Sequence, residues 1–311
     1  MSKQRALVTG GAGFIGSHLV ENLINKGYEI MLVDNLLSGK KENTKNFICE
    51  NILYDDIGSD EILKKVAAFD PDICFHLAAQ ASVVISVENP MLDFEHNILQ
   101  PLKLIEVLQT TNCRKLVFSS SGGTIFGEPK VIPTSEVDFA GEPESPYGIA
   151  KKRLNEYIQL MLSDNTNMTY SILNFSNVYG PRQDPNGEAG VISIFTNKMI
   201  SNSEPIVFGD GEQTRDYIYV QDVVDALISS SKIDSNLFLN IGTGIETSVN
   251  ELVSVLKNTT GYDGNVMYKP KRDGELLRSV LDNSKAKKEL EWEPKYSLAE
   301  GISQLIKWLK D

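Results

Sequence analysis

The stretch TGGAGFIGSH, residues 9–18, constrains the fold more than any other part of this chain. It follows the apolar run RALV and opens a segment of helical periodicity, with Gly10, Gly13 and Gly16 spaced three apart. Glycines at such a turn let backbone amides approach a pyrophosphate at the helix N-terminus. The next strand-like run, EIMLVD, ends in Asp34, which can accept hydrogen bonds from an adenosine ribose and repels a 2′-phosphate. The sequence therefore predicts a site for NAD rather than NADP; the alternative is an ordinary glycine turn beside a solvated aspartate.

Short apolar runs alternate with helix-period segments through the first half of the chain. Strands are expected at RALVTG, EIMLVDN, NFICEN, DICFHLAA and RKLVFSS, and helices at residues 59–69 and 90–110. This alternation is typical of an α/β fold, a Rossmann-type doubly wound parallel sheet. After about residue 175 the pattern becomes irregular. We expect an NAD-binding domain over residues 1–175 and a smaller mixed α/β substrate lobe over 176–311, with segments crossing between them.

Bulk properties narrow the class of protein. The net charge of −12 argues against a nucleic-acid partner. No apolar run reaches the ~18 residues of a membrane span. The first strand begins almost at once, which leaves no room for a signal peptide. Cys49, Cys74 and Cys113 have no metal-binding spacing and are expected to be reduced and buried, as in the cytoplasm.

The stretch SPYGIAKK places Tyr147 four residues before Lys151, on one face of a helix. A nearby ammonium lowers the pKa of a phenol and so makes it a usable base for an alcohol. A hydroxyl from SSSGGTIFGE, residues 119–128, could share that proton at the end of a strand. Taken alone, the pair could lie on the surface and the serines could form a turn. After a dinucleotide loop, the catalytic interpretation is favoured.

Segments along almost the whole chain resemble the extended short-chain dehydrogenases/reductases, and among them the UDP-glucose / UDP-N-acetylglucosamine 4-epimerase family. They are TGGAGFIGSHL, VDNLLSG, HLAAQASV, SSSGGTIFG, SPYGIAKK, NFSNVYGPRQDP, VFGDGEQTRDYIYVQDV and RDGELLRSVLDNSKAKKELEWEP. The resemblance implies epimerisation at C4 of a UDP-hexose with NAD held through the cycle. A hydride leaves C4 for NAD, the 4-keto sugar turns about its diphosphate bond, and the hydride returns to the other face.

The resemblance also implies roles for individual residues. Tyr147 is the base, Lys151 bonds the nicotinamide ribose, and Ser121 assists. Thr124 is held in reserve because the loop has an extra glycine and carries Phe126 where relatives have tyrosine. Asn51-Ile52 stands where relatives have Asp-Ile. The implied cofactor-binding residues are Gly10, Gly13, Phe14, Ile15, Gly16, Asp34, Asn35, Ser38, Gly39, Asn51, Ile52, Ala78, Ala79, Gln80, Asn97, Ser119, Tyr147 and Lys151.

A second set of residues is implied for the sugar nucleotide. Arg215 and Arg272 would clamp the diphosphate, and Ser279 stands where epimerases restricted to glucose and galactose carry tyrosine. The small serine would leave space for an N-acetyl group. Alternatively, the arginines are ordinary surface residues and Ser279 only fills a gap. The full set is Ser82, Ser121, Asn177, Val191, Val207, Phe208, Arg215, Arg272, Glu275 and Ser279.

Other readings remain open within and outside the family. Dehydratases carry an Asp-Glu pair in the serine loop and decarboxylases a glutamate, whereas this loop has Gly122-Gly123-Thr124. A UDP-glucuronate epimerase, a 4-ketoreductase that releases NAD and a non-catalytic NAD-binding scaffold are the remaining alternatives. His18, His76 and His96 are assigned structural roles, and no metal is expected. Helices over residues 90–110 and 146–163 could pair in a homodimer, or their apolar stripes could be ordinary core.

Overall fold

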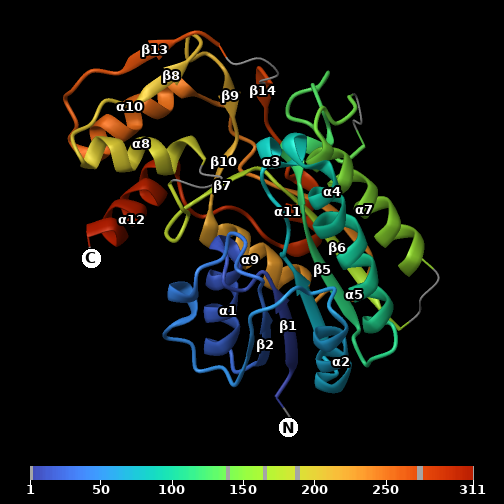
Figure 1. Ribbon diagram of the computed structural model, residues 1–311. Coiled ribbons are helices and arrows are strands. Elements are labelled where there is room, and N and C mark those ends of the chain that lie inside the picture. The colour runs from blue at the N-terminus through green and yellow to red at the C-terminus, as the bar shows by residue number, and fades with distance from the viewer. Residues whose placement is uncertain (1–2, 138–140, 164–166, 186–189, 272–275, 311) are drawn as a thin grey trace.

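The computed structural model describes residues 3–137, 141–163, 167–185, 190–271 and 276–310. A seven-stranded parallel sheet forms its centre (Figure 1). In spatial order the strands are β11 (Leu237–Ile241), β6 (Thr169–Phe175), β5 (Lys115–Ser121), β4 (Ile73–His76), β1 (Arg5–Thr9), β2 (Glu29–Val33) and β3 (Asn51–Leu53). The order reverses between β1 and β4, and ligands bind beyond the carboxyl ends of the strands at such a point.

Helices cover both faces of this sheet because each face carries its own apolar cluster. On one face lie α1 (Phe14–Asn25), α9 (Val220–Ser230) and α11 (Ser284–Leu290). On the other lie α2 (Asp60–Phe69), α5 (Gln100–Leu108) and α7 (Pro146–Leu162). The α/β, Rossmann-type doubly wound sheet predicted from the alternating pattern is confirmed.

The segment between β4 and β5 departs from the single helix expected over residues 90–110. It forms α3 (Val83–Glu88), α4 (Pro90–Phe94), a π-helical turn η2 (Glu95–Leu99) and α5. Pro101, in the first turn of α5, has no N–H to donate to the carbonyl four residues back, that of Asn97. The regular helix is therefore interrupted one turn before the proline, and such π turns recur at functional sites.

The strand expected at NFICEN is also displaced. The structure has strand β3 at Asn51–Leu53, where these residues pair in register with Met31–Val33 of β2. In the preceding stretch Ile48 is 92% exposed, whereas Cys49 packs partly against the core. The apolar residues of NFICEN suggested a strand there, but pairing with β2 places the strand at Asn51–Leu53.

A smaller lobe lies beyond the carboxyl ends of the strands (Figure 1). Its helices α8 (Val191–Ile200), α10 (Val249–Thr260) and α12 (Leu298–Lys310) share one apolar cluster. Its short strands pair as β8 (Ile206–Phe208) with β13 (Met267–Lys269), β7 (Asn177–Tyr179) with β10 (Tyr217–Tyr219), and β9 (Thr214–Arg215) with both β12 (Thr247–Ser248) and β14 (Arg278–Ser279). The short helices η1 (Lys41–Thr44) and α6 (Gly122–Ile125) belong to loops at the sheet.

The chain crosses between the two lobes more than once. β11, α9 and α11 follow residue 175, yet they complete the sheet and cover one of its faces. The division at residues 175/176 stays a prediction, and the cofactor half is built from both sides of it. None of the helices in the described ranges is long and apolar enough to cross a membrane.

Candidate active site

The glycine loop forms one end of a cavity of about 710 Å³. Gly10 follows β1 with φ +70°, and a Cβ there would lie 2.7 Å from the backbone nitrogen of Ala78. A Cβ on Gly16 would strike the carbonyl oxygen of Gly10. Both positions therefore exclude a side chain. Helix α1 begins at Phe14, which lines the cavity, so the N-terminus of the helix, where an anion is favoured, lies at this cavity.

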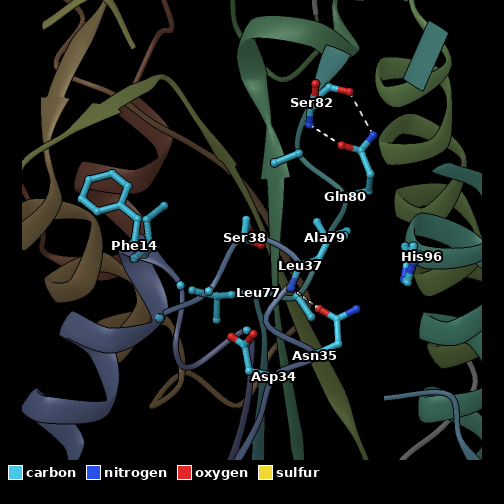
Figure 2. Close-up of a pocket in the computed structure, with 18 of the residues that line it drawn as sticks. Phe14, Asp34, Asn35, Leu37, Ser38, Leu77, Ala79, Gln80, Ser82 and His96 are labelled. Carbon is cyan, nitrogen blue, oxygen red and sulfur yellow. Dashed lines mark hydrogen bonds between the residues drawn. The ribbon is translucent and has the colours of Figure 1, made fainter. Parts of the chain in front are cut away.

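Asp34 follows β2 and lies at the same end of the cavity (Figure 2). Its carboxylate accepts hydrogen bonds from the backbone N–H groups of Ala12, at 2.9 Å, and Leu36, at 2.8 Å. Gly39 packs against it so closely that a Cβ would lie 2.5 Å from Oδ1. The side chain is 5% exposed, and burial raises the pKa of its carboxyl. These contacts fix one carboxylate beside the glycine loop, where an adenosine ribose would need an acceptor.

The segment after β4 forms a second wall, in which Gln80 is held from two sides. Its side chain accepts a hydrogen bond from Ser82 N at 2.6 Å and donates one to Ser82 O at 2.9 Å (Figure 2). Its backbone N–H donates to Asn97 Oδ1 at 3.1 Å, and its carbonyl accepts from Asn97 Nδ2 at 2.8 Å. Asn97, on the π turn, is 2% exposed and stands behind the wall rather than on the cavity lining.

Tyr147 and Lys151 both face the cavity from the first turns of α7. Ser145 caps this helix by accepting a hydrogen bond from Gly148 N, and Pro146 occupies its first position, where no N–H is needed. Lys151 is 3% exposed; its Nζ donates to Ser119 O at 3.0 Å and lies 5.9 Å from the Tyr147 ring centroid. Burial lowers the pKa of Lys151 to about 8.

The serine run ends β5 beside this pair. Ser119 and Ser120 line the cavity, and Ser119 Oγ donates to His76 O at 3.3 Å. Ser121 is the last residue of β5 and the N-cap of α6, and it does not belong to the lining of this cavity in the described chain. Thr124 Oγ1 donates to Ser121 O at 3.4 Å. The catalytic hydroxyl expected from Ser121, with Thr124 in reserve, stays a prediction.

The predicted substrate residues lie mainly on the short strands of the second lobe. Arg215 on β9 pairs in register with Ser279 on β14, and Ser279 Oγ lies 3.9 Å from where a Cβ on Gly123 would be. The serine loop and the smaller lobe thus meet at Ser279. Asn177 lies on β7, Val191 begins α8, and Val207 and Phe208 lie on β8. Arg272 and Glu275 fall outside the described residues.

Asp216, a buried residue between β9 and β10, bonds the strands that carry Asn177 and Ser279. Its carboxylate accepts hydrogen bonds from Thr243 N, Thr243 Oγ1, Gly244 N and Leu281 N. Its backbone N–H donates to Ser279 O at 3.0 Å, and its carbonyl accepts from Asn177 N at 2.9 Å. It is fully buried, and burial raises the pKa of its carboxyl. Asp216 therefore holds Asn177 and Ser279 through its backbone, while its carboxylate binds Thr243, Gly244 and Leu281.

A family profile described as GDP-mannose 4,6 dehydratase matches residues 7–305. A putative UDP-glucose 4-epimerase of Methanocaldococcus jannaschii is 44% identical over 98% of both chains. A UDP-glucose 4-epimerase structure from Thermotoga maritima, with UDP-glucose, is 46% identical, covers 99% of both chains and has a TM-score of 0.94. A UDP-N-acetylglucosamine 4-epimerase structure from Methanobrevibacter ruminantium is 34% identical, covers 100% of this chain and 99% of that one, and has a TM-score of 0.93. The chain belongs to the UDP-sugar 4-epimerase family of short-chain dehydrogenases/reductases.

The enzyme is NAD-dependent, as family membership implies, and its cavity fits that cofactor. A volume of about 710 Å³ lies in the range of small-molecule sites. The predicted cofactor residues that line it are Gly10, Gly13, Phe14, Ile15, Gly16, Asp34, Asn35, Ser38, Gly39, Ala78, Ala79, Gln80, Ser119, Tyr147 and Lys151, with Ser82 from the substrate set. Asn51 and Ile52 lie on β3, away from this lining in the described structure.

Several lining residues of the enzyme were missed by the sequence analysis. His96, given only a structural role there, lines the cavity, as do Lys40 and Asp184. The last two form an ion pair of 2.7 Å between the loop after β2 and the segment after β7. No local sequence pattern predicts the Lys40–Asp184 pair, because its members are 144 residues apart. His96 could have been predicted, because it directly precedes Asn97.

Proposed function

We propose that the enzyme interconverts UDP-N-acetylglucosamine with UDP-N-acetylgalactosamine as well as UDP-glucose with UDP-galactose. The observation that carries the substrate choice is the position of Ser279, beside Gly123 of the serine loop and opposite Arg215. A serine and a glycine leave room at this point for a sugar substituent larger than a hydroxyl. Both substrate types occur among the names of the similar proteins.

The proposed roles of the catalytic residues follow from their placement. Tyr147, close to the start of α7, takes the proton of the C4 hydroxyl. Lys151, held by Ser119 O, places a positive charge beside the phenol and bonds the nicotinamide ribose. Ser121, with Thr124 as the reserve, shares the proton from the end of β5. When bound, NAD supplies reversible acceptance of the C4 hydride.

The second lobe would hold the nucleotide while the sugar turns. Arg215, together with Arg272, is proposed to clamp the diphosphate, because guanidinium groups suit such oxyanions. Val207 and Phe208 are proposed to line the uracil, Glu275 to bind its ribose, and Asn177 to contact the diphosphate sugar. A second hollow of about 270 Å³ is lined by residues that include Phe208, Lys271 and Arg278.

The substrate proposal is tested by turnover without added NAD. Purified enzyme is incubated with UDP-glucose, UDP-N-acetylglucosamine and UDP-glucuronate, and products are resolved by NMR. We expect C4 epimers from the first two and neither epimer nor decarboxylated product from the third. Ser279→Tyr should lower kcat/KM for the acetylated sugar by about tenfold or more, the scale of ~1.4 kcal/mol of lost complementarity.

The matched control in this test is the plain sugar. Ser279→Tyr should leave kcat/KM for UDP-glucose close to wild type, because its 2-hydroxyl needs no extra space. If the wild-type enzyme does not turn over the acetylated sugar, or if Ser279→Tyr lowers kcat/KM equally for both sugars, the assignment of Ser279 is wrong. Binding of UDP-sugars with no turnover would instead support a scaffold.

We also propose that the enzyme is a homodimer of the cytoplasm. Exposed apolar side chains occur on helices that pack against one another, among them Val84 on α3, Met91 on α4 and Leu160 on α7, each more than 60% exposed. A face of this kind is commonly covered by a second copy of the same chain. The three free cysteines, two of them buried, suit a reducing compartment.

A further inference from the structure

Asp93 is a buried acid close to the proposed catalytic lysine to which no role has been assigned above. It lies on α4, one turn before Asn97, and is 1% exposed. Its Oδ1 accepts two hydrogen bonds, from Gln80 Nε2 at 2.9 Å and from Asn97 Nδ2 at 2.8 Å. Ionised carboxylates are rarely buried unless other groups compensate them, so this placement requires an explanation.

The first consequence of Asp93 is mechanical. Gln80 belongs to the cavity wall after β4, and Asn97 belongs to the π turn behind it. The Asn97 side chain bonds the Gln80 backbone, and the amide side chains of both residues donate to the same carboxylate oxygen. Asp93 therefore joins the wall to the helix at the point where the backbone is irregular.

The second consequence is electrostatic. α4, which carries Asp93, packs against α7, which carries Lys151, and both residues are buried. Burial lowers the pKa of Lys151, and the charge of Asp93 opposes that shift. His76 on β4 also interacts with Lys151, and its own pKa is lowered to about 3 by burial and by that lysine, so His76 is neutral at physiological pH.

The surroundings of this pair contain few other ionisable groups among the described residues. Tyr147 shares the helix of Lys151, and His96 on the π turn interacts with Asp93. Lys115 and Tyr170 lie near the starts of β5 and β6, at the end of the sheet away from this pair. Lys115 donates there to three backbone carbonyls. Glu95 on the π turn is exposed. Asp93 is thus the negative group that acts on Lys151.

We propose that Asp93 is a positioning residue of the epimerase: it fixes the Gln80 wall to the π turn and keeps the buried Lys151 protonated. The inference rests on the role proposed for Lys151 in the reaction. Asp93 does not itself line the cavity in the described structure; it acts through Gln80, which does, and through Asn97 and Lys151.

Asp93→Asn separates charge from position, because the asparagine Oδ1 can still accept both hydrogen bonds. The matched control is Glu95→Gln, which removes one charge from the exposed side two residues on. In protein stripped of NAD and labelled with ¹³Cε-lysine, the Lys151 signal is identified by its loss in Lys151→Arg. Its titration midpoint should fall by about 1 pH unit in Asp93→Asn, the low end of the effect of a neighbouring charge, and stay unchanged in Glu95→Gln.

Activity provides the second readout. In Asp93→Asn the alkaline limb of the kcat–pH profile should move to lower pH, by the same amount as the Lys151 titration midpoint. Asp93→Ala also removes the acceptor and leaves two buried donors unpaired. It should therefore weaken NAD binding by about tenfold relative to Asp93→Asn, a difference of ~1.4 kcal/mol.

The outcomes distinguish this inference from the proposed reaction. Equal Lys151 midpoints in Asp93→Asn and Glu95→Gln would overturn the electrostatic part, and equal NAD affinities in Asp93→Ala and Asp93→Asn would overturn the positional part. Because the midpoint is read in protein without cofactor, it decides about Asp93 even if Tyr147 proves not to be the base.

Discussion

Lys151 carries a charge at a position that water reaches poorly. Its Nζ donates to Ser119 O and lies 4.7 Å above the centre of the Phe118 ring, so a carbonyl dipole and a π face replace part of its hydration. The same residue faces the cavity beside Tyr147. A cation that is costly to bury is thereby kept beside Tyr147, where the proposed proton transfer would need a positive charge.

Tyr147→Phe tests the acid–base role directly. The ring remains and the hydroxyl is lost, so kcat should fall by roughly 10²–10⁴, while the affinity for UDP-sugar, measured by calorimetry, should stay near wild type. Tyr157→Phe on the same helix, 46% exposed, is the matched control and should turn over normally. Near-normal kcat in Tyr147→Phe would remove this tyrosine from the mechanism.

At the scale of elements, the serine loop and strand β14 are fitted to each other. Gly122 and Gly123 begin α6 directly after the serine run. A Cβ on Gly122 would lie 2.5 Å from Leu281 Cδ1, whereas one on Gly123 would meet nothing closer than Ser279 Oγ, at 3.9 Å. Leu281 follows β14 by two residues, so crowding at Gly122 is transmitted to the strand that carries Ser279.

The pair Gly122→Ala and Gly123→Ala tests this fit with the same chemical change. Both gain helix propensity, but only Gly122→Ala forces Leu281 to move. We expect Gly122→Ala to be less stable than Gly123→Ala by about 1–3 kcal/mol, the usual cost of overpacking, and to have the lower kcat/KM. Chemical denaturation and initial rates measure both quantities. Equal stabilities would show that Leu281 yields freely and that the loop is not coupled to β14.

At the scale of the whole molecule, the exposed apolar side chains of α3, α4 and α7 predict a dimer. Sedimentation velocity should find two copies at micromolar concentration. The double variant Met91→Glu/Leu160→Glu should weaken association by at least about tenfold, because it puts charges into a covered apolar face. Ile48→Glu, at a side chain 92% exposed in the loop before β3, is the control and should leave the dimer intact. A monomeric wild type would contradict the proposal.

The sequence predicted the parts of the molecule whose chemistry is local. The glycine turn, Asp34 directly after β2 and the Tyr147–Lys151 spacing each depend on a few neighbouring residues, and the structure brings all three to one cavity. The position of strand β3 depends on its pairing register with β2, and the position of the π turn depends on Pro101. The Lys40–Asp184 pair depends on contacts between distant segments, which no window of sequence contains.

The seventh strand has a consequence for how the protein is made. A ribosome releasing residues 1–175 has delivered six strands of the sheet, with the outer edge of β6 bare until β11 emerges at Leu237–Ile241. An uncovered strand edge is a template for pairing with other nascent chains. Helix α11, which covers the same face of the sheet as α1 and α9, is complete only at Leu290. Residues as far as Leu290 must therefore be synthesised before the nucleotide half can close, and a gene truncated between the lobes would encode neither half intact.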